Sequence, residues 1–461
     1  MTSKVKVVVL GLGFVGAAMS IAIASSKTKK GTHNFDVVGV DLPTEEGKKR
    51  IQAINNGTFP FKTSDKKLLS YLKKCYEAGN LKASSSDKYI KNADVIVIDI
   101  NLDARKIKSS NQKNFSSFHV DINTFKKSMT RIALISKSTA LILIETTVPP
   151  GTSEKIILPI FQKTFKKRGI SSEPCIAHSY ERVMPGSNYL DSIINFPRVY
   201  AGTSVESEMR CFSFLSKVIS SPKTNLKKLH STNASEMSKV LENSYRAMNI
   251  AFIDEWSKFA DDAEVNLYEV LDAIKERPTH NNIMSPGLGV GGYCLTKDPL
   301  LASWSSQHLF NSNKLSLSEK AVKVNDLMPS YTHSLIKASL PKNSKILICG
   351  LSYISGVGDD RYTPVELLYK LLLADGYIIE IIDPHLYSWS YNNMLIHTSP
   401  KLEGYDGIII GTAHQEYRSN KFFSLIENLS PKIILDCWNI FKDQDLNSSS
   451  KIITLGNGLR S

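Results

Sequence analysis

The chain has 461 residues, too many for one ordinary hydrophobic core, so we expect two or three domains. A hydrophobic content of 42% and a charged content of 22% are typical of a soluble globular protein. The formal net charge of +13 comes from lysines spread along the whole length. No dense basic run with interleaved aromatic residues occurs, which argues against nucleic-acid binding, although some lysines could face a small anion such as a phosphate ester.

Six cysteines stand at positions 75, 175, 211, 294, 349 and 437, and none forms a C-x-x-C pair. This pattern argues against a disulfide framework and against a zinc site, so we predict no metal. The apolar stretch at residues 5–24 contains Lys6 and three glycines, which a strand, turn and helix explain better than a signal peptide or membrane span. We therefore expect a cytoplasmic protein without membrane association.

The first 41 residues have the pattern of a dinucleotide-binding unit. Residues 5–10 are an aliphatic run, as in a strand buried on both faces, and a G-x-G-x-x-G turn and a helical pattern at 17–24 follow. The glycines permit a tight turn and close approach to a pyrophosphate, whose charge the helix N-terminus favours. A second strand, at residues 35–40, ends in Asp41, where a carboxylate binds the ribose and disfavours NADP. We predict NAD, bound by Gly11, Gly13, Phe14, Val15, Gly16 and Asp41.

Two further buried strands are expected at residues 95–98 and 141–144. Strands that alternate with helical patterns predict a parallel, doubly wound sheet. Ligands in such sheets bind beyond the carboxyl ends of the strands, which places Thr147 at the functional edge. A threonine that merely closes a turn before Pro149 is an equally good interpretation of the local sequence.

A long helix is predicted at about residues 233–262, because apolar residues recur there at three- and four-residue spacing. Asn233 and Glu236 resemble a capping pair at its start. Glu236, Lys239, Asn243 and Arg246 share the opposite face. Local sequence favours a solvated polar stripe, whereas the alternative places Lys239 and Asn243, one turn apart, in an active site.

A glycine-rich segment, residues 286–293, leads directly into Cys294. Most free cysteines are inert buried thiols, but Lys297 and the loop N–H groups could favour a reactive thiolate here. Asp298 could orient or deprotonate water. Asp298 and Pro299 could equally be a helix N-cap and first-turn proline.

Short buried strands at residues 345–350, 379–382, 407–410 and 433–435 predict a second α/β nucleotide-binding domain that lacks a full glycine fingerprint. The fold class is therefore predicted as α/β, with two Rossmann-like doubly wound domains joined by a central helical region that contains the long helix. The expected parts are an NAD-binding domain at 1–208, a central helical region with the cysteine at 209–325, and a second nucleotide-binding domain at 326–461.

Together these separated motifs resemble the nucleotide-sugar 6-dehydrogenases, the UDP-glucose and UDP-N-acetylhexosamine dehydrogenase family. The family's glycine-rich run with cysteine and Lys-Asp is similar to residues 287–298, and its Thr-Val-Pro-x-Gly-Thr segment to residues 147–152. Its Glu-x-x-Lys-x-x-x-Asn motif matches Glu236, Lys239 and Asn243, and its Asp-Asp-x-Arg segment loosely resembles residues 359–361.

The resemblance implies oxidation of the C6 alcohol of a UDP-sugar to a carboxylate with two NAD, through a thiohemiacetal and a thioester on Cys294. It implies that Lys239 and Asn243 stabilise an oxyanion, that Thr147 and Asp298 position water, and that Glu181 assists proton transfer. It adds Thr147 and Lys297 to the NAD site. The implied substrate-binding residues are Glu181, Arg182, Val183, Lys239, Asn243, Gly291 and Arg361, the last reaching across from a partner subunit of a homodimer or higher homo-oligomer.

The substrate and two departures from the family pattern stay open at this point. Glu-Arg-x-x-Pro-Gly at residues 181–186 is typical of the N-acetylhexosamine branch, which we favour, whereas Cys-x-x-Lys-Asp is typical of the UDP-glucose branch. Ile354 replaces a usual lysine and Trp438 a usual arginine. The alternatives are a two-electron hydroxyacid dehydrogenase, which needs no cysteine, and a nucleotide-sugar-binding protein without turnover.

Overall fold

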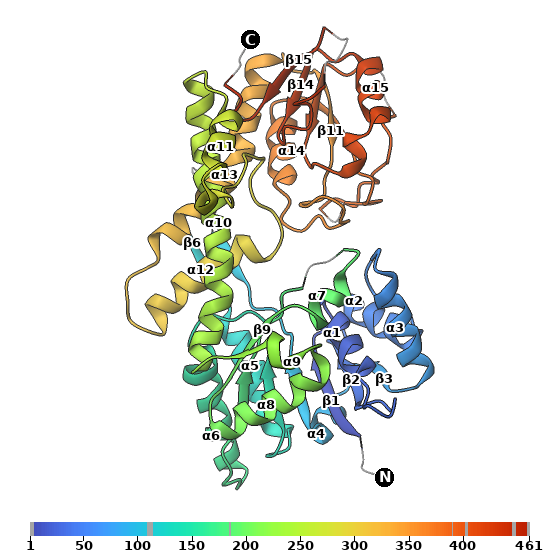
Figure 1. Ribbon diagram of the computed structural model, residues 1–461, viewed down its shortest axis with the longest axis vertical. Helices are drawn as coiled ribbons and strands as arrows, with labels where there is room; N and C mark the ends of the chain where they lie inside the picture. Colours follow the sequence, from blue (N-terminus) through green and yellow to red (C-terminus); the bar gives the residue numbers. More distant parts are fainter. Residues whose placement is uncertain are drawn as a thin grey trace. The chain divides into compact units, whose positions relative to one another are not determined.

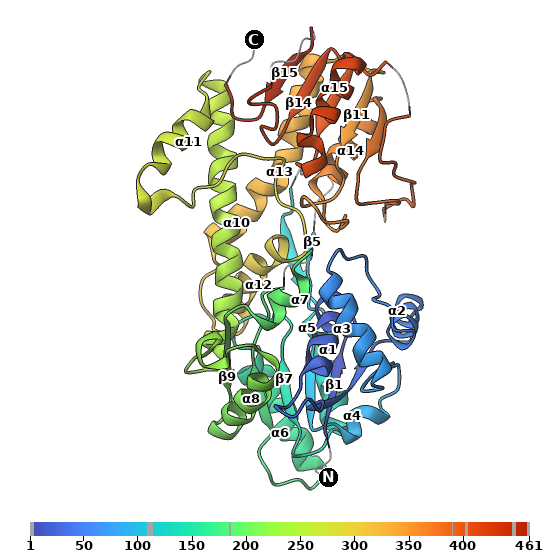
Figure 2. The same ribbon diagram turned by 45° about the vertical axis from the view of Figure 1, so that its right-hand side comes forward.

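The computed structural model describes residues 4–107, 114–183, 186–389, 391–401, 404–444 and 449–458, which form two compact units (Figure 1). Unit 1 comprises residues 1–105, 119–241 and 301–314, and unit 2 comprises residues 106–118, 242–300 and 315–461. Two unit boundaries fall inside helices. These helices are α10 (Thr232–Asp262), whose full length is visible in Figure 2, and α12 (Cys294–His308).

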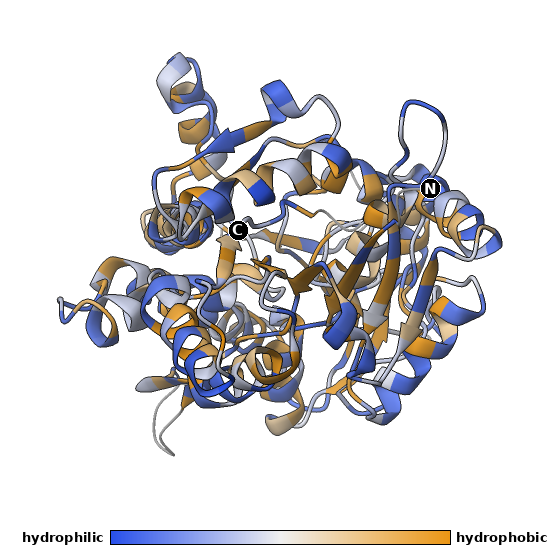
Figure 3. Ribbon diagram, turned by 90° about the horizontal axis from the view of Figure 1, so that it is seen from below, coloured by the Kyte–Doolittle hydropathy of each residue, from blue (hydrophilic) through white to orange (hydrophobic). Residues whose placement is uncertain are grey.

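Unit 1 contains an eight-stranded sheet in the order β10-β9-β8-β7-β4-β1-β2-β3. The strands are β1 (Val5–Leu10), β2 (Phe35–Val40), β3 (Leu81–Ser84), β4 (Val95–Ile98), β7 (Leu141–Ile144), β8 (Cys175–His178), β9 (Arg198–Gly202) and β10 (Leu226–Lys228). Pairing is parallel from β3 through β8, and β9 runs antiparallel to β8. The central strands are buried, and Figure 3 shows them coloured as hydrophobic.

Helices cover the sheet of unit 1. They are α1 (Phe14–Ser25), α2 (Glu45–Asn55), α3 (Lys66–Glu77), α4 (Lys88–Asn92), α5 (Ile122–Ile135), α6 (Leu158–Lys167) with the turn η1 (Ser153–Ile157) before it, α7 (Tyr189–Ile194), α8 (Val205–Val218) and α9 (Pro222–Asn225). The side chains of Thr44, Asp65, Asp121 and Ser204 cap α2, α3, α5 and α8. The cap of α1 is Gly13, whose lack of a side chain leaves the first N–H groups available.

Unit 2 contains a five-stranded parallel sheet in the order β12-β11-β13-β14-β15. Its strands are β11 (Lys345–Cys349), β12 (Ile378–Ile382), β13 (Gly407–Ile410), β14 (Ile433–Asp436) and β15 (Lys451–Thr454). Its helices are α11 (Leu267–Lys275), α13 (Ser316–Ser339), α14 (Pro364–Ala374) and α15 (Asn420–Leu429), with short turns η2 (Pro278–His280) and η3 (Gln415–Arg418). The chain also forms a two-stranded ribbon, β5 (Ala104–Ile107) with β6 (Ser117–Val120). The predicted fold class, two doubly wound domains and a long helix, is confirmed.

Helix α10 buries several polar residues and exposes much of its apolar stripe. Six large apolar residues of α10 are exposed, namely Met237, Leu241, Tyr245, Phe252, Trp256 and Phe259. Glu236 and Lys239 are buried, so the interpretation of a solvated polar stripe is wrong for both. Glu236 does not cap the helix either, because its carboxylate accepts the N–H groups of Gly151 and Ser153.

None of the described helices combines the length and apolar character needed to cross a membrane.

Candidate active site

The turn between β1 and α1 has the geometry that a dinucleotide pyrophosphate requires. Gly11 has φ +97°, and a Cβ there would lie 2.4 Å from the carbonyl oxygen of Asp99. A Cβ on Gly16 would lie 1.9 Å from the carbonyl oxygen of Gly11, so a side chain is excluded there too. A Cβ added at Gly13 would meet no other part of the chain within 4 Å, so there is open space beside this residue at the helix N-terminus. Phe14 and Val15 begin α1, whose first turn carries no acidic residue.

Asp41 lies directly after β2, beside this turn. Its carboxylate accepts the N–H of Leu12 at 3.3 Å and that of Leu42 at 2.8 Å. Arg50 approaches the same carboxylate at 3.2 Å. These contacts fix an acceptor at the carboxyl end of the second strand, where a ribose hydroxyl donates in dinucleotide-binding sheets. The residues present therefore fit NAD.

Thr147 follows β7 at the carboxyl edge of the same sheet and is half-buried. The segment before it is fixed, because the N–H groups of Glu145 and Thr146 both donate to the carbonyl of Ile98. The Glu145 side chain is fully buried and pairs with the guanidinium of Arg198. The backbone directly before Thr147 is therefore fixed at the carboxyl edge of the sheet.

Lys239 and Glu181 form a buried pair in unit 1. The Lys239 ammonium donates to the backbone carbonyl of Glu181 at 3.0 Å and lies 3.8 Å from its carboxylate. The same ammonium lies 5.2 Å from the centroid of the Tyr180 ring. The Glu181 carboxylate in turn accepts the N–H of Val183. A cation and a carboxylate shielded from water interact strongly with each other and with a ligand.

The structure describes residues 181–183 and 186 of the predicted substrate loop. Arg182 donates to the carbonyl of Pro197 at 2.7 Å and to the Tyr180 hydroxyl at 3.2 Å. Val183 packs partly buried against the core of unit 1. Met184 and Pro185, which complete the loop motif, lie outside the described residues.

Cys294 begins α12 and is exposed, whereas the other five cysteines are buried. Asp298 lies one helical turn later, on the same face of α12. The helix continues through Pro299, so the interpretation of Asp298 and Pro299 as N-cap and first-turn proline is wrong. Asp298 is inside the helix because the helix begins four residues earlier, at the cysteine.

Asn243 and Lys297 both contact Asp298. The Asn243 amide donates to one carboxylate oxygen of Asp298 at 2.6 Å. The Lys297 ammonium lies 3.2 Å from the other oxygen, Oδ1, without the alignment of a hydrogen bond, and 4.5 Å from the Tyr293 ring centroid. Asp298 is fully buried, so its Oδ1 is a shielded acceptor without a hydrogen-bond donor.

Arg361 forms a salt bridge with Asp359. Its guanidinium donates to the carboxylate through Nε at 2.9 Å and Nη2 at 2.6 Å. Its backbone carbonyl accepts the N–H of Gly292, two residues before Cys294, at 3.0 Å. Gly291 lies beside it in the same loop. Arg361, Gly291 and Cys294 are thus brought together within unit 2.

The two departures from the family pattern differ in their surroundings. Ile354 is exposed. Trp438 is half-buried and donates its indole N–H to the carbonyl of Gly411 at 3.0 Å.

Sequence patterns identified Glu236 but not its burial, and they missed the buried carboxyl group of Asp254; both groups contact segments around the site. Burial raises the pKa of Glu236 to about 8, against the opposing effect of the Ser153 and Gly151 N–H groups. Burial likewise raises the pKa of Asp254 to about 7, and this carboxylate accepts the N–H of Gly287 at 3.3 Å. The three-residue spacing of Glu236 and Lys239 indicates that both side chains lie on one face of the helix. Spacing alone does not show that this face is buried.

Among the described residues, His385, His414 and Glu416 bring possible metal-ligand atoms within 4.8 Å of one another. Both ring nitrogens of His414 already have partners, since Nδ1 accepts the Gly356 N–H at 3.2 Å and Nε2 lies 3.1 Å from Asp383. We therefore assign no metal to this group.

Three models of the UDP-glucose/GDP-mannose dehydrogenase family match the chain in succession. The NAD binding domain matches residues 5–219, the central domain residues 233–327, and the UDP binding domain residues 347–443.

Curated relatives and solved structures match most of the chain. A UDP-N-acetyl-D-mannosamine dehydrogenase of Methanocaldococcus jannaschii is 29% identical over 98% of this chain and 97% of its own length. Its counterpart from Escherichia coli strain K12 is 28% identical over 79% of this chain and 81% of its own length. The structure of a UDP-D-ManNAc dehydrogenase from Pyrococcus horikoshii superimposes with a TM-score of 0.80 at 27% identity, covering 98% of this chain and 99% of that one.

Proposed function

The chain belongs to the UDP-glucose/GDP-mannose dehydrogenase family and is an NAD-dependent UDP-sugar dehydrogenase, and from this premise we propose that it oxidises the C6 alcohol of a UDP-N-acetylhexosamine to the uronate. UDP-N-acetyl-D-mannosamine is the substrate that the names of its relatives favour. The Glu-Arg-x-x-Pro-Gly loop at residues 181–186 supports the same branch.

The reaction removes four electrons. One alcohol, two NAD and one water give one carboxylate, two NADH and three protons. NAD, when bound at the β1–α1 turn, supplies the hydride acceptor for both oxidations. Gly11, Gly13 and Gly16 leave room for its pyrophosphate, and Asp41 binds its ribose.

Cys294 acts as the nucleophile. Its thiolate adds to the aldehyde carbon and forms a thiohemiacetal, and loss of hydride from that carbon leaves a thioester. Water then attacks the thioester carbonyl, the carbon–sulfur bond breaks, and the thiolate is released with the carboxylate. A covalent intermediate also keeps the reactive aldehyde on the enzyme.

Lys239, Asn243, Glu181 and Thr147 have supporting roles. The Lys239 ammonium and the Asn243 amide stabilise the oxyanion that develops at C6. Glu181, whose carboxylate lies 3.8 Å from that ammonium, accepts a proton during hydrolysis, and Thr147 helps to hold the attacking water and the nicotinamide. Lys297 belongs to the NAD site, while Arg182, Val183, Gly291 and Arg361 contact the UDP-sugar.

The observation that carries this proposal is the pair of Cys294 and Asp298 on one face of α12. The thiol is exposed, and the buried carboxylate one turn away has an oxygen, Oδ1, that is ion-paired with Lys297 at 3.2 Å but accepts no hydrogen bond. Asn243 holds the other oxygen at 2.6 Å and so fixes the carboxylate. A water that donates to the remaining oxygen would be oriented beside the thioester.

We further propose a cytoplasmic homodimer or higher homo-oligomer that supplies uronic acids for a surface polysaccharide. The exposed apolar side of α10 supports the assembly, because six large apolar side chains gather there. The three parts at 1–208, 209–325 and 326–461 correspond to NAD binding, assembly with the catalytic cysteine, and UDP-sugar binding.

A substrate panel tests the proposal. Purified enzyme with NAD should show its highest kcat/KM with UDP-N-acetyl-D-mannosamine, and lower values with UDP-N-acetyl-D-glucosamine and UDP-glucose. Turnover of a simple hydroxyacid but of no UDP-sugar would support a two-electron hydroxyacid dehydrogenase. Binding of NAD and UDP-sugar without any NADH would support a binding protein.

A further inference from the structure

Three of the four glycines in the loop before Cys294 are in close contact with aromatic side chains of unit 2. A Cβ on Gly287 would lie 2.6 Å from Cζ3 of Trp438. A Cβ on Gly291 would lie 2.5 Å from Cβ of Tyr353, and one on Gly292 would lie 2.6 Å from Cε2 of the same tyrosine. The glycines therefore do not leave this loop without tertiary contacts. They allow two aromatic side chains to lie directly against its backbone.

We propose that Tyr353 and Trp438 are positioning residues that hold the loop of residues 287–292 and thereby set the place of the Cys294 thiol, an inference that rests on the proposed function of that thiol. Tyr353 acts on the last two glycines of the loop, and Trp438 acts on the first.

Both aromatic residues are themselves fixed. Trp438 donates its indole N–H to Gly411 at the end of β13, at 3.0 Å, and its backbone N–H to the carboxylate of Asp436, also at 3.0 Å. Tyr353 donates its backbone N–H to the carbonyl of Asp359 at 2.9 Å. The neighbouring Arg361 carbonyl binds the Gly292 N–H at 3.0 Å, so the backbones of the two loops are joined as well.

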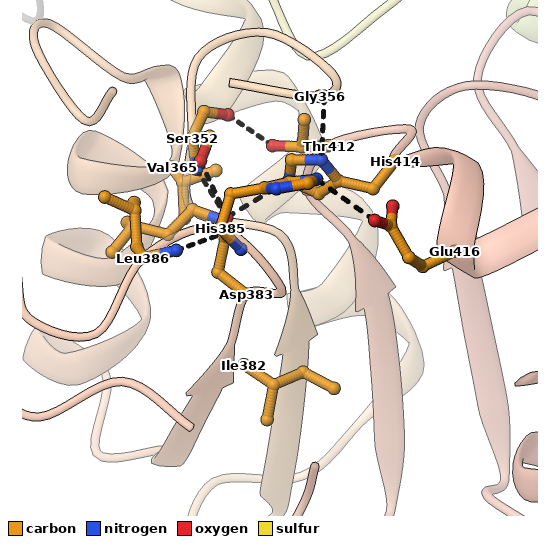
Figure 4. Close-up of polar contacts among 12 residues, drawn as sticks. Ser352, Gly356, Val365, Ile382, Asp383, His385, Leu386, Thr412, His414 and Glu416 are labelled. Atoms are coloured by element: carbon orange, nitrogen blue, oxygen red, sulfur yellow. Dashed lines mark hydrogen bonds and ion pairs between the residues drawn. The ribbon is translucent and has the colours of Figure 1, made fainter. Parts of the chain in front are cut away.

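Asp383 and His414 bind the two ends of the segment at residues 351–356, and Figure 4 shows them with Ser352 and Gly356. Asp383 accepts the N–H groups of Leu351 at 2.8 Å and Ser352 at 2.9 Å, and also the Ser352 hydroxyl at 2.9 Å. His414 accepts the N–H of Gly356 at Nδ1, so its ring proton is on Nε2 and is directed to Asp383, 3.1 Å away.

The pKa of Asp383 is consistent with this anchor. Burial raises it, but the hydrogen bond from His414 and the N–H groups outweigh burial and lower the pKa to about 2. The carboxylate therefore stays ionised at neutral pH and accepts from Leu351 and Ser352 at one end of the segment, while His414, which contacts Asp383, accepts the N–H of Gly356 at the other end. Asp383 and His414, which follow strands of unit 2, thus fix the segment on both sides of Tyr353. Tyr353 in turn packs against the glycines of the cysteine loop.

The readout is the alkylation of Cys294 in the intact enzyme, because the other five cysteines are buried. Tyr353→Leu and Trp438→Leu should lower both the iodoacetamide rate at Cys294 and kcat by about tenfold or more, since a small displacement of a reacting group has large kinetic effects. NAD and UDP affinities, measured by calorimetry, should change by no more than about twofold. Tyr353→Phe keeps the ring and should behave as wild type, as should Tyr387→Leu, a matched change at an exposed tyrosine of the same unit.

Gly287→Ala tests the same contact without removing a large side chain. Its added methyl meets the Trp438 ring, so it should slow alkylation and turnover in the wild-type background and have little further effect in Trp438→Leu. Unchanged alkylation and kcat in the leucine variants would overturn the inference, as would additive effects of the two substitutions. A loss explained by weaker UDP binding would also overturn it, because the aromatic residues would then be substrate ligands.

Failure of the proposed function is distinguishable from failure of this inference. It would appear in the wild type, as uronate formation that survives complete alkylation of Cys294.

Discussion

Cys294 differs from the other cysteines in its surroundings. Burial raises the pKa of Cys75 to about 11 and that of Cys211 to about 12, so these thiols stay protonated at neutral pH. Cys294 is exposed at the N-terminus of α12, with Lys297 in the same turn. A helix N-terminus and a nearby cation both favour a thiolate. The proposed nucleophile is therefore distinguished from the other cysteines by its position and not by its residue type.

Replacement of Cys294 by serine should lower the rate of uronate formation by at least about 100-fold, or about 2.7 kcal/mol of transition-state stabilisation. The serine hydroxyl is a far weaker nucleophile than a thiolate, whereas NAD binding does not involve this residue. Steady-state kinetics and NAD titration of the variant measure both effects. Cys75→Ala is the matched control and should keep wild-type kcat per folded molecule. Undiminished uronate formation by Cys294→Ser would refute the covalent route.

Glu236 should make the stability of the fold depend on pH. Burial raises the folded-state pKa from 4.5 to about 8, so the folded state binds the extra proton between these values. The stabilisation is complete below about pH 4.5 and is lost as pH rises through about 8. Glu236→Gln does not titrate, so the difference in unfolding free energy between wild type and variant should fall by up to about 1.4 kcal/mol per pH unit in this window. Guanidinium unfolding from pH 5 to 8.5 measures it, and a difference independent of pH would contradict the assignment.

At the scale of elements, α10 has the most unusual distribution of residues. It is a 31-residue helix whose apolar stripe is exposed and whose buried side carries charges. Burial of one such apolar side chain contributes about 1.5–3 kcal/mol to stability. Six exposed side chains on one helix are therefore a large apolar surface whose burial would be favourable. A second copy that covers the stripe would bury Leu241 and Trp256 in both copies.

A charged side chain introduced into the exposed apolar stripe of α10 should dissociate the proposed oligomer. Leu241→Asp and Trp256→Glu should each weaken self-association by about 100-fold or more, because each leaves an unpaired buried carboxylate in both copies. Sedimentation equilibrium over a range of concentrations gives the mass. Leu373→Asp on α14 is a matched control at an exposed leucine and should leave the mass unchanged. A wild type that sediments as a monomer would contradict the assembly.

The elements that the sequence predicts well are those with local signals. The strands at residues 5–10, 35–40, 95–98 and 141–144 have the predicted bounds, because continuous aliphatic runs bounded by glycines or acids mark buried parallel strands. The burial of Glu236 could not be predicted, since its partners Gly151 and Ser153 lie more than 80 residues away. The close contact of Tyr353 with Gly292 likewise could not be predicted, because it joins residues far apart in the sequence. The local sequence shows only that a glycine, which has no side chain, leaves room for such a contact.

At the scale of the whole molecule, the two doubly wound sheets belong to domains that bind different ligands. The sheet of unit 1 has the β3-β2-β1-β4 order of dinucleotide-binding folds, and the sheet of unit 2 has its first strand, β11, beside β12 and β13. Ligands bind where the strand order reverses, at the carboxyl ends. One chain thus offers one site for NAD and one for the nucleotide of its substrate, with the cysteine loop attached to the second.

The stoichiometry of the reaction tests the central proposal most directly. Purified enzyme with NAD and UDP-N-acetyl-D-mannosamine should release two NADH for each uronate, and no free aldehyde should accumulate, because the intermediate stays bound to Cys294. NADH absorbance and chromatographic quantification of the product give the ratio. A ratio of one with an aldehyde product would contradict the four-electron oxidation.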